Sequence, residues 1–360
     1  MDAIPRGQRG RVVADRIRCE ITTGRWPLGT RLPAEPELAR SHGVGVNTVR
    51  RAVDRLIVEG LVERRQGSGT RVIDTPARTE GPLLIGVIVP DNSYYFPRVV
   101  EGIEQFASAE HIRLVLACSY YNPDLELRRA RELVSAGVAG LIIAPTMHKD
   151  DQAARRLAVL ARLGVPHILL ERSPGLGPGE PAAYARTDTV GGGYAAVRHL
   201  AGLGRRRVGY MGRIGTATSE DVRAGYRSAV EDLGVATAPE AVQRQTRWSY
   251  PLIADYAARC RQTGVDGVLC LGDREGAALV DHLGRLGLSV PDDVAVVTYD
   301  DEEASLAPLP LTAVSPPKRE LGRTAVQALI RQIELGDGAP ICQVQYQPRL
   351  AVRASCGAGA

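Results

Sequence analysis

Charged and polar side chains recur directly after apolar runs in the last four-fifths of the chain. The residues in these positions are Asp91, Asn92, Glu171, Arg172, Arg213, Asp273, Asp300 and Asp301. Aromatic residues stand near them in sequence, with Tyr94, Tyr95 and Phe96 after the first run and Trp248 in a later connection. Carboxylates and guanidinium groups can hold hydroxyls from several directions, and aromatic faces can cover an apolar ring face. The set therefore predicts a site for a polar ligand the size of a sugar or a nucleoside.

The elements that must position these side chains alternate between strand and helix. Strand-like runs cover residues 83–90, 113–117, 140–145, 167–171, 207–212, 267–272 and 294–299. Helical periodicity covers residues 97–110, 191–203 and 321–333. Several of the strand runs are apolar on both faces, as parallel sheets require. Repeated βα units of this kind predict an α/β fold with open, doubly wound parallel sheets in two lobes.

In an open α/β sheet a ligand binds beyond the carboxyl ends of the strands, so the charged residues are expected to share one edge of each sheet. Each acidic residue has a second interpretation as a helix N-cap. Asp273 precedes an expected helix over residues 274–286 and could be only a cap. Both interpretations stay open for any one residue, whereas the cluster as a whole favours a ligand site.

The first 73 residues have a different pattern, with three short helices and a hairpin. Val13, Ile17 and Ile21 recur every four residues and predict a helix that ends at Gly24. A second helix is expected after Pro33, and a third from about residue 46 to residue 60. Residues 61–65 and 70–73 are typical of two strands around a turn. Two helices that meet at a short turn, followed by a two-stranded ribbon, predict a winged helix-turn-helix.

The charge distribution separates the same two parts of the chain. Residues 1–75 hold 14 basic and 9 acidic residues, a net charge of +5, whereas residues 76–360 hold 31 and 32, a net charge of −1. Basic residues of the first part fall on its third helix and its ribbon, namely Arg50, Arg51, Arg64, Arg65 and Arg71. A plain helical bundle with a hairpin is the alternative, but this placement of cations favours a DNA-binding module.

Residues 10–73 resemble the DNA-binding domain of GntR-family regulators. The resemblance is carried by Gly24–Glu35, Leu38-Ala39, Gly43-Val44, Asn47–Ala52, Gly60-Leu61 and Gly67–Thr70. It implies that Asn47, Thr48 and Arg50 face the major groove and that Gly67 at the tip of the wing approaches the minor groove or the backbone. The full set of DNA contacts that it implies is Arg31, Glu35, Asn47, Thr48, Arg50, Arg51, Gln66, Gly67 and Ser68. Pro36 and Val46 stand where such regulators commonly place an Arg and a base-reading residue, so the operator sequence does not carry over.

Residues 83–353 resemble the LacI-type effector domain, which is itself similar to periplasmic sugar-binding proteins. The motifs are Ile85–Pro90 with Tyr95-Phe96, Asp188 with Gly191–Gly193, Arg223–Tyr226, Gly272-Asp273, Val290–Val297, Tyr299–Asp301 and Pro310–Val314. The resemblance implies that Phe96 and Trp248 stack on the ligand and that Arg223 and Asp300 hold it from one lobe. The chain departs at Gly272, where relatives often carry an Asn, and at Glu171-Arg172, where Asp-Arg is common.

The expected effector contacts are therefore Asp91, Tyr95, Phe96, Glu171, Arg172, Arg223, Trp248, Asp273 and Asp300. The expected domains are a winged head over residues 1–73, a linker over residues 74–82, and an effector domain over residues 83–353. The resemblance places lobe 1 at about 83–186 and 309–335 and lobe 2 at about 187–308 and 336–353. Three crossings between the lobes would permit closure about a bound molecule.

The sequence offers no pattern for catalysis, for a metal site or for a cofactor. Neither GxxxxGK[ST] nor GxGxxG is present, and the six His have no metal-ligand spacing. Lys149 and Lys318 are the only lysines, and neither ends an apolar strand or belongs to a Ser-x-x-Lys motif. The six Cys show no CxxC spacing and are expected to be reduced thiols.

These observations lead to the hypothesis of a ligand-responsive transcription regulator that is not an enzyme. We expect a homodimer on a palindromic double-stranded operator, because one small head offers too few contacts for specificity. A sugar or similar effector would close the lobes and change the distance between the heads, and repression relieved by the ligand is the expected sign. No apolar run is long enough for a membrane span and the first residues lack a secretory signal, so we expect a cytoplasmic protein. The alternative is a sugar- or nucleoside-processing enzyme with an autoregulatory DNA-binding head.

Overall fold

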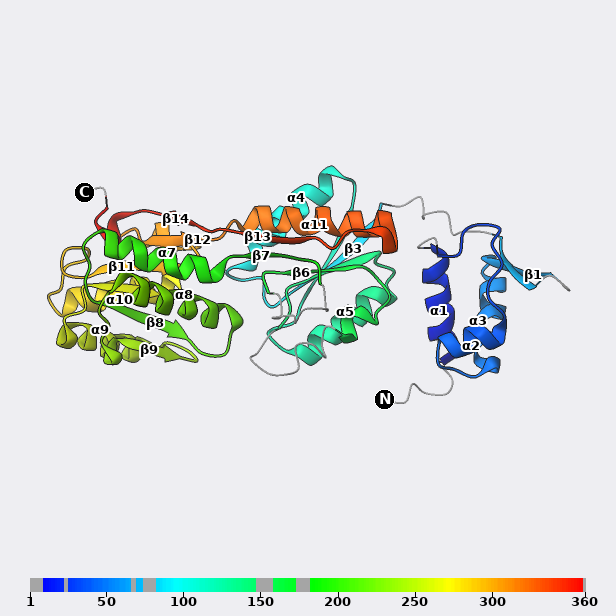
Figure 1. Ribbon diagram of the computed structural model, residues 1–360, viewed down its shortest axis with the longest axis horizontal. Coiled ribbons are helices and arrows are strands. Elements are labelled where there is room, and N and C mark those ends of the chain that lie inside the picture. The colour runs from blue at the N-terminus through cyan, green and yellow to red at the C-terminus, as the bar shows by residue number, and fades with distance from the viewer. Residues whose placement is uncertain are drawn as a thin grey trace. The chain divides into compact units, whose positions relative to one another are not determined.

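The computed structural model describes residues 9–22, 25–65, 69–73, 82–146, 158–172 and 182–358. Contacts along the chain divide it into two compact units, one centred on the first 83 residues and the other holding most of the remainder. We call them the head and the body and describe each by itself (Figure 1).

The head contains three helices and a two-stranded antiparallel ribbon. The elements are α1 (Arg9–Thr22), α2 (Glu35–Ser41), α3 (Val46–Val58), β1 (Val62–Arg65) and β2 (Gly69–Val72). Ile17 and Ile21 of α1 pack with Leu38 of α2 and with Val49 and Leu56 of α3, and all of them are buried. The i, i+3, i+4, i+7 spacing of the apolar residues on α3 gives this helix one buried face and leaves the opposite face to solvent. The predicted winged helix-turn-helix is confirmed.

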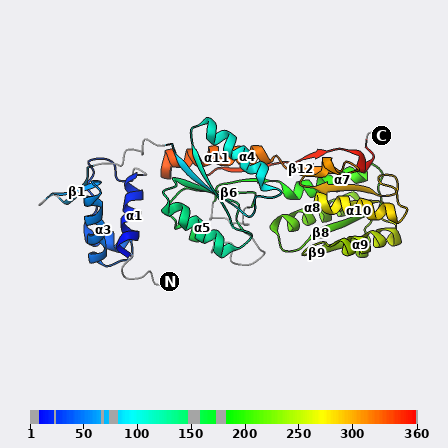
Figure 2. The ribbon, with the colours of Figure 1, turned by 180° about the vertical axis from the view of Figure 1, so that it is seen from behind.

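The first sheet of the body is parallel throughout, with the strand order β13-β7-β6-β5-β3-β4. Its strands are β3 (Leu84–Val89), β4 (Arg113–Cys118), β5 (Gly140–Ile143), β6 (His167–Leu170), β7 (Tyr184–Thr187) and β13 (Gln343–Tyr346). Helix α5 (Pro123–Ser135) lies on one face, and α4 (Phe96–Ala109) and α11 (Lys318–Leu335) lie on the other (Figures 1 and 2). This sheet and its helices form lobe 1.

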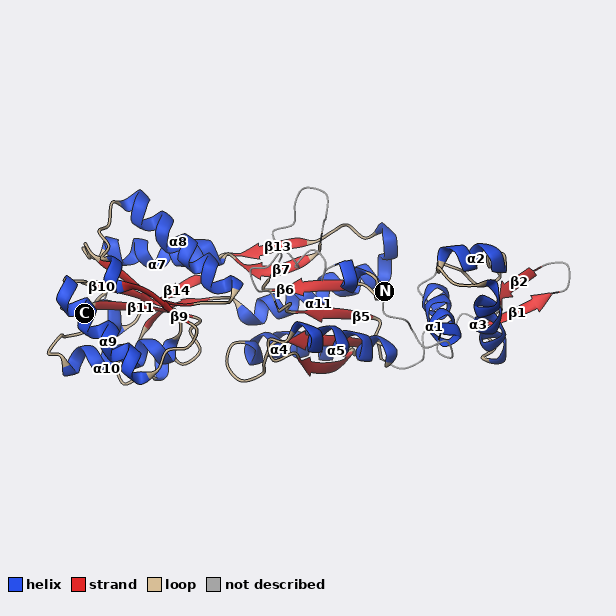
Figure 3. Ribbon diagram, turned by 90° about the horizontal axis from the view of Figure 1, so that it is seen from below, coloured by secondary structure: helices blue, strands red, loops and turns tan. Residues whose placement is uncertain are grey.

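The second sheet has the order β14-β12-β11-β10-β8-β9, and only β14 runs antiparallel to its neighbour. Its strands are β8 (Val208–Arg213), β9 (Val242–Gln245), β10 (Gly267–Cys270), β11 (Ala295–Tyr299), β12 (Thr312–Ser315) and β14 (Arg349–Ala351). Helices α7 (Thr189–Gly202) and α8 (Ala217–Leu233) cover one face, and α9 (Tyr250–Thr263) and α10 (Asp273–Arg285) cover the other (Figure 3). This sheet and its helices form lobe 2.

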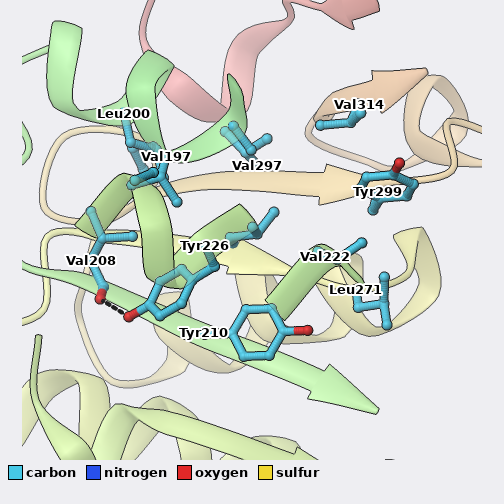
Figure 4. Close-up of a cluster of buried hydrophobic side chains, with 14 of the residues drawn as sticks. Val197, Leu200, Val208, Tyr210, Val222, Tyr226, Leu271, Val297, Tyr299 and Val314 are labelled. Carbon is cyan, nitrogen blue, oxygen red and sulfur yellow. Dashed lines mark hydrogen bonds between the residues drawn. The ribbon is translucent and has the colours of Figure 1, made fainter. Parts of the chain in front are cut away.

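Alternation along the strands of lobe 2 fills a separate core on each face. Val208 and Tyr210 of β8 join the cluster under α7 and α8, whereas Met211 joins the cluster under α9 and α10. Figure 4 shows the first cluster, in which the Tyr226 hydroxyl donates to the backbone oxygen of Val208 at 2.7 Å. Apolar residues on both sides of one strand are what a doubly wound sheet requires, and that predicted fold class is confirmed.

The expected lobe boundaries need correction at two places. Residues 312–315 were expected in lobe 1, but β12 pairs with β11 in lobe 2. Residues 343–346 were expected in lobe 2, but β13 pairs with β7 in lobe 1. The physical reason is that backbone pairing, rather than sequence order, decides which sheet a late strand completes.

Helix α11 is tied to lobe 1 by close backbone contact with α4. A Cβ on Gly102 would lie 2.1 Å from the backbone oxygen of Arg319, and one on Gly322 would lie 2.2 Å from that of Val99. The two glycines therefore allow the helices to approach more closely than any larger residue would permit. The consequence is that Lys318, the first residue of α11, lies with lobe 1 although it follows the last long strand run of lobe 2.

Candidate functional site

The exposed face of α3 carries the side chains expected to contact DNA. Asn47, Arg50 and Arg51 are exposed and Thr48 is half-buried, because Val49 and its apolar partners turn the other face of α3 into the core. An exposed first turn of the second helix of a helix-turn-helix is the part that reaches base edges in the major groove. Val46 is also exposed, at 36%.

Glu35 connects three elements of the head through two arginines. Its carboxylate accepts a hydrogen bond from Arg50 Nε of α3 at 3.0 Å and another from Arg64 Nη2 of β1 at 2.9 Å. Arg64 also lies 3.1 Å from the carboxylate of Asp54. Two of the basic side chains on the predicted DNA face are therefore held in place by one carboxylate at the start of α2.

The wing begins next to Arg31, whose backbone bridges to Arg71 of β2. The guanidinium of Arg31 packs against Gly69, where a Cβ would come within 2.6 Å of its Nε. The predicted wing-tip contacts Gln66, Gly67 and Ser68 lie outside the described residues, as does most of the expected linker.

In lobe 1 the predicted effector residues meet in two groups. The Tyr95 hydroxyl donates to Glu171, which also accepts from the backbone nitrogen and the hydroxyl of Thr187. Burial raises the pKa of Glu171 above its usual range, and these hydrogen bonds oppose the rise. Phe96 is buried at the start of α4, edge-on to Tyr95 with 5.3 Å between ring centroids.

Asp91 and Arg172 belong to the second group, with Tyr121 between them. Asp91 accepts hydrogen bonds from Ser93 and from the Tyr121 hydroxyl, each at 3.0 Å. The guanidinium of Arg172 stacks over the Tyr121 ring and donates from Nη1 to the backbone oxygen of Pro145 at 3.1 Å. Arg172 Nε is buried and has no hydrogen-bond partner among the described residues. A buried donor without a partner is costly unless a ligand accepts from it.

Arg223 of α8 has the same property in lobe 2. Its Nε is buried and has no partner in the described part of the chain, and its Nη1 lies 3.9 Å from the carboxylate of Glu220. Arg172 and Arg223 thus provide one unpartnered guanidinium donor in each lobe.

Asp300 presents a carboxylate that no described residue hydrogen-bonds. Its backbone is held instead, with the nitrogen donating to Val314 and the oxygen accepting from Lys318 Nζ. Burial and the negative charge of Asp273 raise the pKa of Asp300 to about 7, although Lys318 opposes the rise. Its φ is +97°, a conformation that a non-glycine residue rarely adopts. Backbone strain and a raised pKa at the end of one strand are typical of a functional residue.

Asp273 has its carboxylate fully used inside the protein. It accepts from the Thr298 hydroxyl at 2.7 Å, from the backbone nitrogens of Glu302 and Glu303, and from the Tyr94 hydroxyl at 3.3 Å. The N-cap alternative is wrong, because Gly272 is the N-cap of α10 and no side chain caps it. Asp273, the first residue of α10, therefore has a structural role, because it holds the loop after β11. Its contact with an effector stays a prediction.

Trp248 lies in the core under α9 and α10 and is only 6% exposed. Its indole nitrogen donates to the backbone oxygen of Gly212 at 2.7 Å, and its ring meets Tyr256 edge-on. The structure therefore does not bring Trp248 together with Phe96, and the stacking role expected for both residues stays a prediction.

Sequence reasoning missed a set of polar contacts that join the two lobes. The carboxylate of Glu302 lies 2.7 Å from Lys318 Nζ and 3.0 Å from Arg98 Nε, both of lobe 1. Tyr94 of lobe 1 donates across to Asp273. Lys318 is one of only two lysines in the chain, and this rarity was the one sequence signal that could have drawn attention to it.

Among the described residues, no group of three or more His, Cys, Asp or Glu side chains could hold a metal ion. Among the described helices, none is both long and apolar enough to cross a membrane.

Known proteins share both parts of this architecture. Residues 10–72 match the family described as bacterial regulatory proteins, gntR family, and residues 197–356 match the periplasmic binding protein-like domain. The chain is 29% identical over 353 residues to the arabinose metabolism transcriptional repressor of Geobacillus stearothermophilus, covering 93% of this chain and 94% of that protein. It is 30% identical over 291 residues to the HTH-type transcriptional regulator MalR of Streptomyces coelicolor, covering 77% and 81%.

Among solved structures, the complex of the transcriptional regulator CelR with cellobiose has the same fold. Its TM-score is 0.66 at 24% identity, with 90% of this chain and all of that chain covered. A winged head beside a two-lobed periplasmic-binding-protein-like body defines a DNA-binding transcriptional regulator with an effector domain. The chain belongs to the bacterial regulators that join a gntR-family head to such a body. The relatives named here are all transcriptional regulators.

Proposed function

We propose that this protein is a repressor whose affinity for its operator falls when a sugar or similar polar molecule binds between the lobes of the body. The observation that carries the proposal is a set of polar groups without a hydrogen-bond partner among the described residues: Arg172 Nε and the Asp300 carboxylate, which follow strands, and Arg223 Nε on α8. Donors from both lobes and an acceptor from one are what a polyhydroxylated ligand requires. The arabinose repressor and the cellobiose-bound regulator among its relatives support the ligand class.

The proposed partner of the head, residues 1–73, is double-stranded DNA. The head would bind it through α3 and the wing formed by β1 and β2. The expected contacts remain Arg31, Glu35, Asn47, Thr48, Arg50, Arg51, Gln66, Gly67 and Ser68. A partner of this kind implies action in the cytoplasm, where the chromosome lies.

We infer a homodimer on a palindromic operator, formed through the edge of lobe 1. Strand β4 ends the first sheet, and no strand among the described residues pairs with its outer edge. Val115 and Leu116 of β4 are 37% and 40% exposed, and Tyr120, two residues beyond its end, is 69% exposed. An apolar edge strand is a template for pairing with a second copy. Sedimentation equilibrium should give a dimer for the wild type and a monomer for Leu116→Asp. Leu306→Asp, which alters an 80% exposed apolar residue elsewhere, should remain a dimer.

A thermal-shift screen of the full chain tests the effector class. The panel consists of L-arabinose, cellobiose, maltose and gluconate, with adenosine and glycerol as comparisons. We expect at least one sugar to raise the midpoint, because a ligand that binds only the native state stabilises it. No shift with any sugar up to about 1,000 times a micromolar dissociation constant would contradict the proposal.

A further inference from the structure

Three neighbouring strands of lobe 2 end side by side in the same register. Met211 of β8 pairs with Cys270 of β10, and Cys270 pairs with Thr298 of β11. Two residues further along each strand stand Arg213, Gly272 and Asp300. The carboxyl edge of lobe 2 therefore presents a basic residue, a gap without a side chain, and an acidic residue in adjacent positions.

The gap at Gly272 is filled from α10. A Cβ on Gly272 would lie 2.4 Å from Glu275 Oε2 and 3.9 Å from Arg213 Nη2, so no larger residue fits there without displacing Glu275. Gly272 has φ +115°, which also disfavours any other residue. The Glu275 carboxylate pairs with Arg213 Nη2 directly over this glycine.

Arg213 is held at its backbone and open at its side chain. Its backbone nitrogen donates to Ser219 Oγ at 3.2 Å, and its backbone oxygen accepts from Ser219 Oγ and from Arg244 Nε. Its side chain is 46% exposed, whereas that of Glu275 is only 13% exposed. A guanidinium has five N–H donors, and Glu275 is the only hydrogen-bond acceptor that the described residues offer to those of Arg213.

We propose that Arg213 and Glu275 are specificity-determining residues of the effector site, where Arg213 donates to the effector beside Asp300 and Glu275 cancels its charge. The inference rests on the proposed function and deepens it. The Arg213–Glu275 pair has no net charge. The carboxyl edge of lobe 2 therefore selects a neutral sugar over an acid of the same ring configuration. An Arg213 without its carboxylate partner would instead attract an anionic sugar.

The test compares matched neutral and acidic sugars by calorimetric titration of the full chain. The probes are L-arabinose with D-galacturonate, and cellobiose with cellobiouronate, which carries a carboxylate at C6 and keeps both rings. Wild type should prefer the neutral member of the pair that it binds. Glu275→Gln should shift the ratio of the two affinities about tenfold toward the acid. The double variant with Arg213→Gln and Glu275→Gln should not show this shift. Glu132→Gln, which removes a carboxylate from an exposed ion pair on α5, is the matched control and should leave the ratio unchanged.

The outcomes separate this inference from the proposed function. If wild type binds none of the four probes, the proposed sugar site fails and the inference fails with it. If wild type binds a probe but Glu275→Gln keeps the ratio within twofold of the Glu132→Gln control, only the inference is overturned. If Glu275→Gln does not fold, Arg213→Gln alone decides: it should weaken the neutral sugar about tenfold, and unchanged affinity would overturn the inference.

Discussion

Replacement of Asp300 by Asn should make the ligand-free protein more stable while weakening effector binding. Burial raises the pKa of Asp300 from 3.8 to about 7, so the folded protein holds this proton far more tightly than the unfolded chain does. A group with a raised pKa in the folded state contributes full stability below its unfolded pKa, and that contribution is lost as the pH rises through the folded pKa. At pH 8 the ionised carboxylate therefore costs the fold about 4 kcal/mol as an upper limit.

The expected gain for Asp300→Asn depends on pH in a specific way. At pH 5 the Asp300 carboxyl is largely protonated in the folded protein but ionised in the unfolded chain. This difference lowers the free energy of unfolding by about 1.5 kcal/mol. The gain should therefore grow by about 2–3 kcal/mol between pH 5 and pH 8. Asn tolerates a positive φ better than most residues, so the +97° backbone is not a separate source of loss. Effector affinity should fall about 10-fold to 150-fold, as expected for the loss of a hydrogen bond to a charged group.

Urea denaturation at pH 5 and pH 8, followed by circular dichroism, measures this effect. Asp292→Asn, which alters an exposed carboxylate outside the site, is the control and should change the free energy of unfolding by less than about 0.5 kcal/mol at either pH. A gain that is equal at the two pH values, or no gain at pH 8, would refute the assignment of Asp300 as a buried carboxylate kept for a ligand.

Further expectations concern the head and the contact between the lobes. Arg50→Ala should abolish operator binding in gel shifts and leave calorimetric sugar binding intact; unchanged DNA affinity would remove α3 from the interface. Glu35→Gln should weaken operator binding less than Arg50→Ala does, because the two arginines lose a positioning partner but keep their charge. Lys318→Met should lower the free energy of unfolding by about 2–4 kcal/mol, since it leaves the buried Glu302 with Arg98 alone; the double variant with Glu302→Gln should recover at least 1 kcal/mol. A loss below about 0.5 kcal/mol for Lys318→Met would show that this ion pair is not a significant link between the lobes.

Local sequence patterns predict much of this architecture. The period of Val49, Val53 and Leu56 predicts α3, and long apolar runs such as Leu84–Val89 predict the inner strands, because a strand buried on both faces must be apolar throughout. The edge strands β9 and β13 were missed. β9 is half-buried throughout, β13 alternates exposed and half-buried positions, and both carry polar residues, so their sequences do not differ from those of loops.

The site was predictable in position but only partly in role. The strand ends of a parallel sheet locate Asp300 and Arg172 without knowledge of any contact. The partners of each side chain depend on how distant segments meet, and these are invisible in the sequence. Asp273 is satisfied by residues about 25–30 positions further along and by Tyr94 of the other lobe, and Trp248 turns into the core rather than toward a strand end.

A sugar held between the lobes should change the affinity of the head for DNA. Fluorescence anisotropy with an operator selected from a random DNA pool, titrated with and without the sugar found in the thermal-shift screen, tests it directly. We expect the sugar to raise the dissociation constant for the operator about 5-fold to 150-fold in the wild type. Asp300→Asn should need about 10-fold to 150-fold more sugar for the same effect. A sugar that binds the wild type by calorimetry yet leaves its operator affinity unchanged would contradict the account.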